Sequence, residues 1–170
     1  MKLSRLQLDY MIFVLNGGPG SGNFGHAGRP GKVGGSRSDG SSPFQYELSE
    51  GASIQWGYAG DPNNFNIVYA NGSRVTGIIS TDFPNDKISE TRGEIWYAEV
   101  PKGLQKKGIG FEIVQDALNI LRSKGMRTVN LSSVSGGGRA LIEKLVREKE
   151  IGKKLRESTT GKAEYILLGR

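Results

Sequence analysis

The segment that most constrains the fold is a predicted strand followed by a short loop rich in glycine and lysine, and then by an amphipathic helix. The strand ends at Val100, the loop reads Gln-Lys-Lys-Gly-Ile-Gly at residues 105–110, and the helix is predicted to run to about Lys124. Glycine lets backbone N–H groups approach a ligand closely, and the positive end of the helix dipole points toward the same place. Lys106 and Lys107 add positive charge at the rim. The segment therefore predicts an anion-binding strand–loop–helix.

The glycine spacing separates this loop from two common phosphate-binding motifs. GxxxxGK[ST] is absent, and so is GxGxxG with an acidic ribose partner on the next strand. The form Gln-x-x-Gly-x-Gly, placed after a Val-Pro strand end, resembles the pyrophosphate-binding motif of the GNAT acetyltransferases, the Gcn5-related family that binds acetyl-coenzyme A. The structural alternative is an ordinary glycine pair at a helix start.

The order of the predicted elements matches the topology of that family over roughly residues 44–168. We expect strands at 44–48, 54–58, 65–69, 74–79, 93–100, 127–131 and 164–168, and helices at 108–124 and 138–150. The strand at 127–131 is expected to lie parallel to the one before the loop. The resemblance implies an α/β protein with a mixed sheet, in the GNAT-like acyl-CoA N-acyltransferase fold. No helical period occurs between residues 44 and 65, so the N-terminal helices of the family are reduced to loops, or a partner chain builds the acceptor side.

Composition excludes several kinds of chemistry. The chain of 170 residues has no cysteine and a single histidine, His26, which excludes disulfides, zinc–thiolate sites, a cysteine nucleophile and multi-histidine metal sites. No metal site is predicted. No apolar run reaches membrane-spanning length, and the apolar residues 11–15 follow Asp9, which makes a poor signal peptide. We expect an intracellular protein that does not bind membranes.

Charge is divided between the two halves of the chain. Residues 44–100 hold three basic and eight acidic residues, whereas residues 101–170 hold fifteen basic and seven acidic ones. A basic C-terminal half suits a cofactor with three phosphates. Nucleic acid is the competing explanation for the net charge of +6, but glutamates interleave with the basic residues at 143–150, which is typical of a solvated helix face.

The N-terminal part predicts three segments: residues 1–16, a glycine-rich segment at 17–42, and a folded domain at 43–170. So many glycines disfavour a packed core, and a flexible linker is the simplest interpretation. Residues 22–31, however, read Gly-Asn-Phe-Gly-His-Ala-Gly-Arg-Pro-Gly, which resembles a short element found in proteins of tailed-phage head-morphogenesis clusters. That resemblance implies phage or prophage origin, a place in the host cytoplasm, and association with phage head proteins in the virion.

The GNAT resemblance also implies roles for individual residues. Glu94 is in the position of the general base that takes a proton from an amine acceptor. Glu99, the second carboxylate of the strand, is expected on the opposite face by alternation. The residues expected to contact acetyl-coenzyme A are Ala98, Glu99, Val100, Gln105, Lys106, Lys107, Gly108, Ile109, Gly110 and Ser135. For Ser135 a helix-capping role is the alternative, and for Glu94 the alternative is a solvated strand-end carboxylate.

One position departs from the family. The tyrosine that protonates the leaving thiolate is replaced by Ile142, which cannot donate a proton. Two functions therefore stay open. The chain is an acetyltransferase acting on an unidentified amine, or it is a GNAT-like protein with reduced catalysis that serves phage assembly or host interaction.

Overall fold

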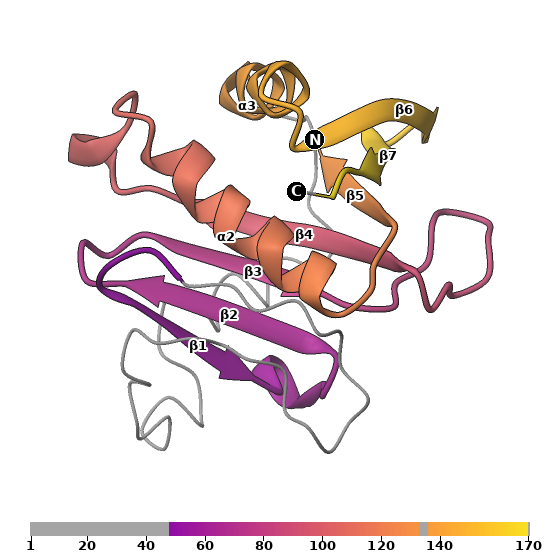
Figure 1. The fold of residues 1–170 in the computed structure, drawn as a ribbon, viewed down its shortest axis with the longest axis horizontal. Coiled ribbons are helices and arrows are strands. Elements are labelled where there is room, and N and C mark those ends of the chain that lie inside the picture. Colours follow the sequence, from indigo (N-terminus) through magenta and orange to yellow (C-terminus); the bar gives the residue numbers. More distant parts are fainter. Residues whose placement is uncertain (1–47, 133–135, 170) are drawn as a thin grey trace.

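A computed structural model describes residues 48–132 and 136–169. Its centre is a seven-stranded mixed sheet in the order β1-β2-β3-β4-β5-β7-β6, with two helices on one face (Figure 1). The strands are β1 (Ala52–Trp56), β2 (Asn64–Tyr69), β3 (Arg74–Ile78), β4 (Arg92–Glu99), β5 (Thr128–Ser132), β6 (Ile151–Glu157) and β7 (Lys162–Leu167). The helices are α2 (Ile109–Ser123) and α3 (Gly136–Arg147), with short 3-10 turns η2 (Tyr58–Gly60) and η3 (Lys102–Leu104).

The strands β1 to β4 are antiparallel neighbours, and β5 is parallel to β4. The crossover between β4 and β5 is α2, as the loop–helix pattern predicts. The predicted hairpin is also present: β2 and β3 join through Asn71 and Gly72, and Gly72 has a φ of 84° that suits glycine. The predicted mixed α/β fold is confirmed.

One predicted strand cannot be compared with the structure, one ends at a different residue, and one observed strand was not predicted. The predicted strand at 44–48 falls almost wholly outside the described residues, and the next strand ends at Trp56 rather than at Tyr58, which lies in η2. The edge strand β6 was not predicted. Its sequence, Ile-Gly-Lys-Lys-Leu-Arg-Glu, carries charges at most positions, which hides the alternation of a strand but is typical of a protected sheet edge.

Between β1 and β2 the described chain contains only η2, so the helices that the family places there are reduced, as expected.

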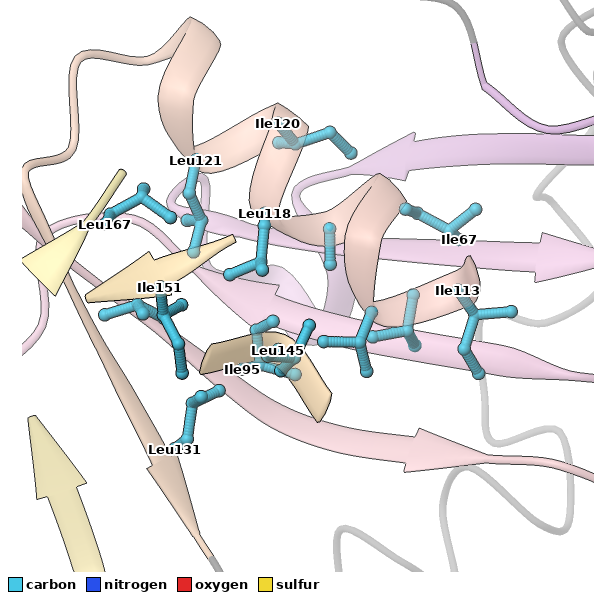
Figure 2. Close-up of a cluster of buried hydrophobic side chains, with 14 of the residues drawn as sticks. Ile67, Ile95, Ile113, Leu118, Ile120, Leu121, Leu131, Leu145, Ile151 and Leu167 are labelled. Carbon is cyan, nitrogen blue, oxygen red and sulfur yellow. The ribbon is translucent and has the colours of Figure 1, made fainter. Parts of the chain in front are cut away.

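The hydrophobic core lies between the sheet and the two helices (Figure 2). The buried residues of α2 recur at helical spacing, so that one face of the helix meets the sheet. They are Ile113, Val114, Ala117, Leu118, Ile120 and Leu121. From α3, Leu145 joins the same cluster.

Two glycines in the sheet allow a neighbouring side chain to pack directly against the backbone. A Cβ at Gly77 in β3 would overlap the ring of Phe65, and a Cβ at Gly93 in β4 would overlap the side chain of Leu121. The contact of Gly93 with Leu121 lets α2 lie close to β4, whereas the contact of Gly77 with Phe65 lies between β3 and β2.

Candidate functional site

The loop between β4 and α2 lies between a strand and a helix, as the sequence predicts. The side-chain Nε2 of Gln105 donates a 3.0 Å hydrogen bond to the carbonyl of Val100, which folds the loop back on the strand end. The backbone is left-handed at Lys106 (φ 62°) and at Gly108 (φ 85°). Gly108 is the N-cap of α2 and has no side chain to cap it. No side chain among the described residues caps the first turn of the helix.

Five consecutive amides, those of residues 106–110, find no hydrogen-bond acceptor among the residues that the structure describes. They lie at the positive end of the 15-residue helix α2, and the side chains of Lys106 and Lys107 are exposed beside them. This arrangement can hold an anion such as a phosphate group.

The two glycines of the motif are required for different reasons. The positive φ of Gly108 is strained for any residue with a side chain, although no atom lies within 4 Å of a Cβ there. Gly110 has no positive φ, and a Cβ would lie 3.9 Å from the side chain of Val100, an ordinary contact. Backbone conformation therefore explains Gly108, and internal packing does not explain Gly110.

The neighbouring strands part beside this loop. β4 pairs with β5 only through residues 92–94 and 128–130, so Glu94 and Asn130 form the last paired position. The rest of β4, including Ala98 and Glu99, pairs with β3 on its other side and has no partner on the β5 side. Beyond Glu94 the two strands therefore separate, and Glu94 lies at the apex of the splayed strands.

A β-bulge in β4 corrects one sequence-based expectation. Tyr97 pairs with Thr76 and Ile95 pairs with Gly77, so Trp96 is an extra residue in β4. The bulge shifts the alternation by one, and Glu94 and Glu99 therefore lie on the same face of the sheet. The prediction that they lie on opposite faces was wrong, because simple alternation does not anticipate a bulge.

Glu94 is buried on the sheet face away from α2. Its exposed fraction is 6%, Thr81 Oγ1 donates to its Oε2 over 3.1 Å, and Lys162 Nζ lies 2.8 Å from the same oxygen. Burial raises the pKa of Glu94 above the ordinary carboxyl value, although the hydrogen bonds and charge of Lys162 and the hydrogen bond of Thr81 oppose that rise. Glu94 is thus not the solvated strand-end carboxylate that its position in the sequence allows.

The same face carries a second acidic group near the far end of β4. Glu99 Oε2 lies 3.0 Å from Arg74 Nε. Burial, followed by the hydrogen bond and charge of Glu99, raises the pKa of Tyr97 to about 12. A phenol with this pKa is a weak acid, so Tyr97 is suited to positioning rather than to proton donation near neutral pH.

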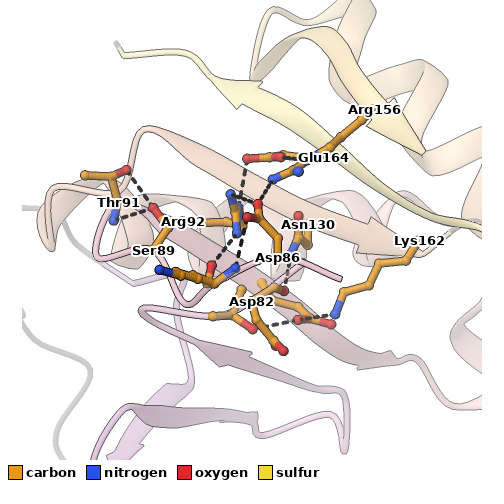
Figure 3. A network of polar contacts seen from close by, with 12 residues as sticks. Asp82, Asp86, Ser89, Thr91, Arg92, Asn130, Arg156, Lys162 and Glu164 are labelled. Carbon is orange, nitrogen blue, oxygen red and sulfur yellow. Dashed lines mark hydrogen bonds and ion pairs between the residues drawn. The ribbon is translucent and has the colours of Figure 1, made fainter. Parts of the chain in front are cut away.

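A clamp of charged side chains holds the loop of residues 79–91 over this face (Figure 3). Arg92 of β4 contacts Glu164 of β7 (2.9 Å) and Asp86 of the loop (3.2 Å). Arg156 of β6 contacts the same two carboxylates, each over 2.6 Å, and its guanidinium lies over the ring of Phe83. The clamp keeps Thr81, which precedes it in the loop, beside Glu94.

Sequence reasoning missed the partners of Glu94 and the whole clamp. The sequence does contain a pattern that fits these ion pairs. Arg92 and Glu94 are two residues apart in one strand, and Lys162 and Glu164 are two residues apart in another. Opposite charges at a spacing of two on two strands of one sheet are compatible with ion pairs across that face, although here β5 lies between β4 and β7.

Other predicted positions contribute differently. Ile142 is half-buried and packs against the core, and Ser135 lies outside the described residues, as do segments 1–16 and 17–42. Within residues 48–132 and 136–169, no group of three or more metal-ligating side chains gathers. No helix in that part of the chain has the length and apolar character needed to cross a bilayer.

Comparison with known proteins agrees with this arrangement. The model of the acetyltransferase (GNAT) family matches residues 37–145, which is more than half of the chain. The chain belongs to the GNAT acetyltransferase family. A search of curated proteins finds no match.

Solved structures of GNAT proteins are similar at low identity. A GNAT-family acetyltransferase from Desulfovibrio desulfuricans is 13% identical with a TM-score of 0.41, and the match covers 62% of this chain and 68% of that one. Gcn5 from Tetrahymena is 9% identical with a TM-score of 0.44, covering 66% and 73%. A Bacillus subtilis acetyltransferase in complex with CoA is 16% identical with a TM-score of 0.40, covering 63% and 76%.

The clamp is expected to carry a large share of the stability. Arg92→Met leaves the buried Glu164 with Arg156 alone, and breaking a buried pair costs about 3–5 kcal/mol in the free energy of unfolding. Burial works to raise the pKa of Glu164, but hydrogen bonds from Arg92, Thr128 and Arg156 outweigh it and lower that pKa. A lowered carboxyl pKa stabilises the fold above the unfolded-state value and loses that effect as pH falls through the folded-state value.

The wild-type advantage over Arg92→Met should therefore shrink in acid, below the ordinary carboxyl range of about 4. Denaturant titrations at neutral and acidic pH measure this difference. Arg147→Met is the matched control, because Arg147 and Glu148 are exposed and 3.7 Å apart, and a change of less than about 1 kcal/mol is expected. Equal costs for the two variants would contradict a stabilising role for the clamp.

Proposed function

We propose that this protein transfers an acetyl group from acetyl-coenzyme A to an amine acceptor. The observation that carries the proposal is the run of unbonded amides at residues 106–110, placed beside splayed strands with a buried carboxylate, Glu94, at the apex. Membership of the GNAT family supports the reaction class.

Each part of the site has a role in this proposal. The loop of Gln105, Lys106, Lys107, Gly108, Ile109 and Gly110 binds the pyrophosphate, with the amides of residues 106–110 as donors and the two lysines at the rim. The main chain of Ala98, Glu99 and Val100 binds the pantetheine arm between the splayed strands β4 and β5, and Ser135 contacts the arm from the start of the α3 segment. The thioester supplies an activated acetyl group.

Glu94 acts as the general base. Its carboxylate takes a proton from the acceptor amine, whose nitrogen forms a bond to the acetyl carbon as the carbon–sulfur bond breaks. The raised pKa suits this role, because a base with a pKa nearer to the working pH accepts a proton more readily.

We also propose that the protein is encoded by a phage or prophage, acts in the host cytoplasm and associates with phage heads through its glycine-rich segment. The support is the amino-acid sequence of residues 22–31, which resembles the short element of phage head-morphogenesis clusters described above. Residues 43–170 form the catalytic domain in this proposal, and residues 1–16 and 17–42 are separate segments.

A second function is favoured by two observations. Ile142 stands in the place of the family's acid, and Glu94 is held in an ion pair with Lys162 rather than left open. These features suit a protein that binds acetyl-coenzyme A without turnover and serves phage assembly or host interaction.

Acetyl-coenzyme A should raise the melting temperature of the wild type. A ligand bound only by the folded state adds about 2.7 kcal/mol at a hundredfold excess over its dissociation constant. Gly108→Val should lose this shift, because valine at a φ of 85° distorts the loop that presents the amides.

The matched control is Gly125→Val at the other end of α2. Gly125 has a φ of 78° and, like Gly108, open space at its Cβ, so the strain on the fold is similar. Gly125→Val should lower the starting melting temperature but keep the shift caused by the cofactor. A wild type that does not respond to millimolar cofactor would refute the proposed function.

Glu94→Gln should keep the affinity for acetyl-coenzyme A and slow transfer by about 10²–10⁴-fold, the usual loss on removing a general base. In the wild type, kcat/KM over a panel of primary amines should rise with pH through the raised pKa of Glu94, since only the carboxylate accepts a proton. The variant should keep only the rise that comes from deprotonation of the amine itself. Release of free thiol measures both profiles, and identical profiles would favour the second function.

Deleting residues 1–42 tests the proposed segments. The truncated chain should keep its melting temperature and its cofactor affinity, because glycine-rich sequence has few apolar groups to bury. It should lose co-sedimentation with phage heads, which the full chain should show. Unfolding of the truncated chain would mean that the domain begins before residue 43.

A further inference from the structure

The partner of the buried carboxylate is itself a primary amine. Lys162 lies on β7, opposite Ser132 of β5, and its Nζ is 2.8 Å from Glu94 Oε2 on β4. Because β5 lies between β7 and β4, the two side chains together span two strand spacings, about 10 Å, to make this contact. Figure 3 shows the side chain of Lys162 extended from its strand, with its ion pair drawn as a dashed line.

The amine lies where the proposed reaction needs one. Glu94 is the last residue of β4 that pairs with β5, so Lys162 Nζ is at the apex of the splayed strands. The Lys162 side chain is 23% exposed and that of Glu94 is 8% exposed, so the nitrogen is more open to a reagent than the base behind it. A tethered amine beside a base reacts as if present at very high concentration.

The type of cation matters here. Asp86, Glu99 and Glu164 are each paired with an arginine, whereas Glu94 is paired with a lysine. A guanidinium stays protonated and serves as a permanent counter-ion, whereas an ammonium can give up a proton and become a nucleophile. An ion pair that serves only structure does not require a cation that can lose a proton.

We propose that Lys162 is a site of self-acetylation. One ammonium proton of Lys162 passes to the Glu94 carboxylate, and the free nitrogen forms a bond to the acetyl carbon of acetyl-coenzyme A. The carbon–sulfur bond breaks, and the thiolate leaves with the second proton that the nitrogen loses. The products are an acetamide on Lys162, free coenzyme A and one proton on Glu94, which passes to solvent. The inference rests on the proposed function.

The test uses the full chain and isotopically labelled acetyl-coenzyme A. Intact mass and peptide mapping are measured before and after incubation and should show one acetyl group on Lys162. Molecules whose Lys162 was unmodified at the start should carry the isotopic label after incubation. With saturating acetyl-coenzyme A, uptake should be first order and its rate constant independent of protein concentration, because the cofactor site, the base and the acceptor lysine belong to one protein molecule. Lys162→Arg should remove the site, and Glu94→Gln should slow uptake by at least about 10²-fold.

Lys154 is the matched control. It too is in an ion pair, 2.6 Å from Glu157, but its side chain is 50% exposed and lies on the edge strand away from Glu94. Non-enzymatic acetylation follows exposure and would modify Lys154 at least as fast as Lys162. Equal labelling of the two lysines, or unchanged labelling in Glu94→Gln, would overturn the inference.

Two results separate this inference from the proposed function. A wild type that binds acetyl-coenzyme A and acetylates an added amine, while Lys162 stays unmodified, overturns self-acetylation and leaves the acetyltransferase in place. A wild type whose melting temperature ignores acetyl-coenzyme A, and which takes up no label, overturns both.

Discussion

The extra residue in β4 at Trp96 decides which side chains of that strand share a face. Without the bulge, Glu99 would lie on the face toward α2, away from its partner Arg74. With it, Glu94, Tyr97 and Glu99 all lie on the polar face, and each carboxylate meets a cation there. The bulge also bends β4 close to the point where its pairing with β5 ends.

The two faces of the sheet are held by different interactions. The face toward α2 and α3 is apolar, and Gly77 and Gly93 let it come into tight contact with the ring of Phe65 and the side chain of Leu121. That packing fixes α2, and with it the amides of its first turn. The other face carries the ion pairs, and there Arg92 and Arg156 hold the loop of residues 79–91 together with the buried ring of Phe83. A rigid anion site thus lies beside a polar face that charge pairing keeps in place.

Much of this could be predicted from local sequence, because the signals were local. The glycine and lysine loop before an amphipathic helix, and the Asn-Gly turn between two apolar strands, each specify a backbone conformation within a few residues. The bulge at Trp96 could not be predicted. It depends on the pairing register with β3, and the sequence of β4 alone does not specify that register. The contact between Lys162 and Glu94 joins positions far apart in the chain, and it needs the strand order to be known first. The edge strand β6 was hidden by its charges.

The pairing of Glu94 with Lys162 sets a condition on any acceptor from outside the chain. If Glu94 is the base, as we propose, an external amine must compete for the carboxylate with the tethered ammonium of Lys162, and tethering favours the internal group. Acetylation of Lys162 would end that competition, because an acetamide is neutral and cannot form the ion pair. The pKa of Glu94 would then rise further, since burial would act on it without the opposing charge of Lys162. One reaction would thus both free the carboxylate for another amine and move the pH at which it can act as a base.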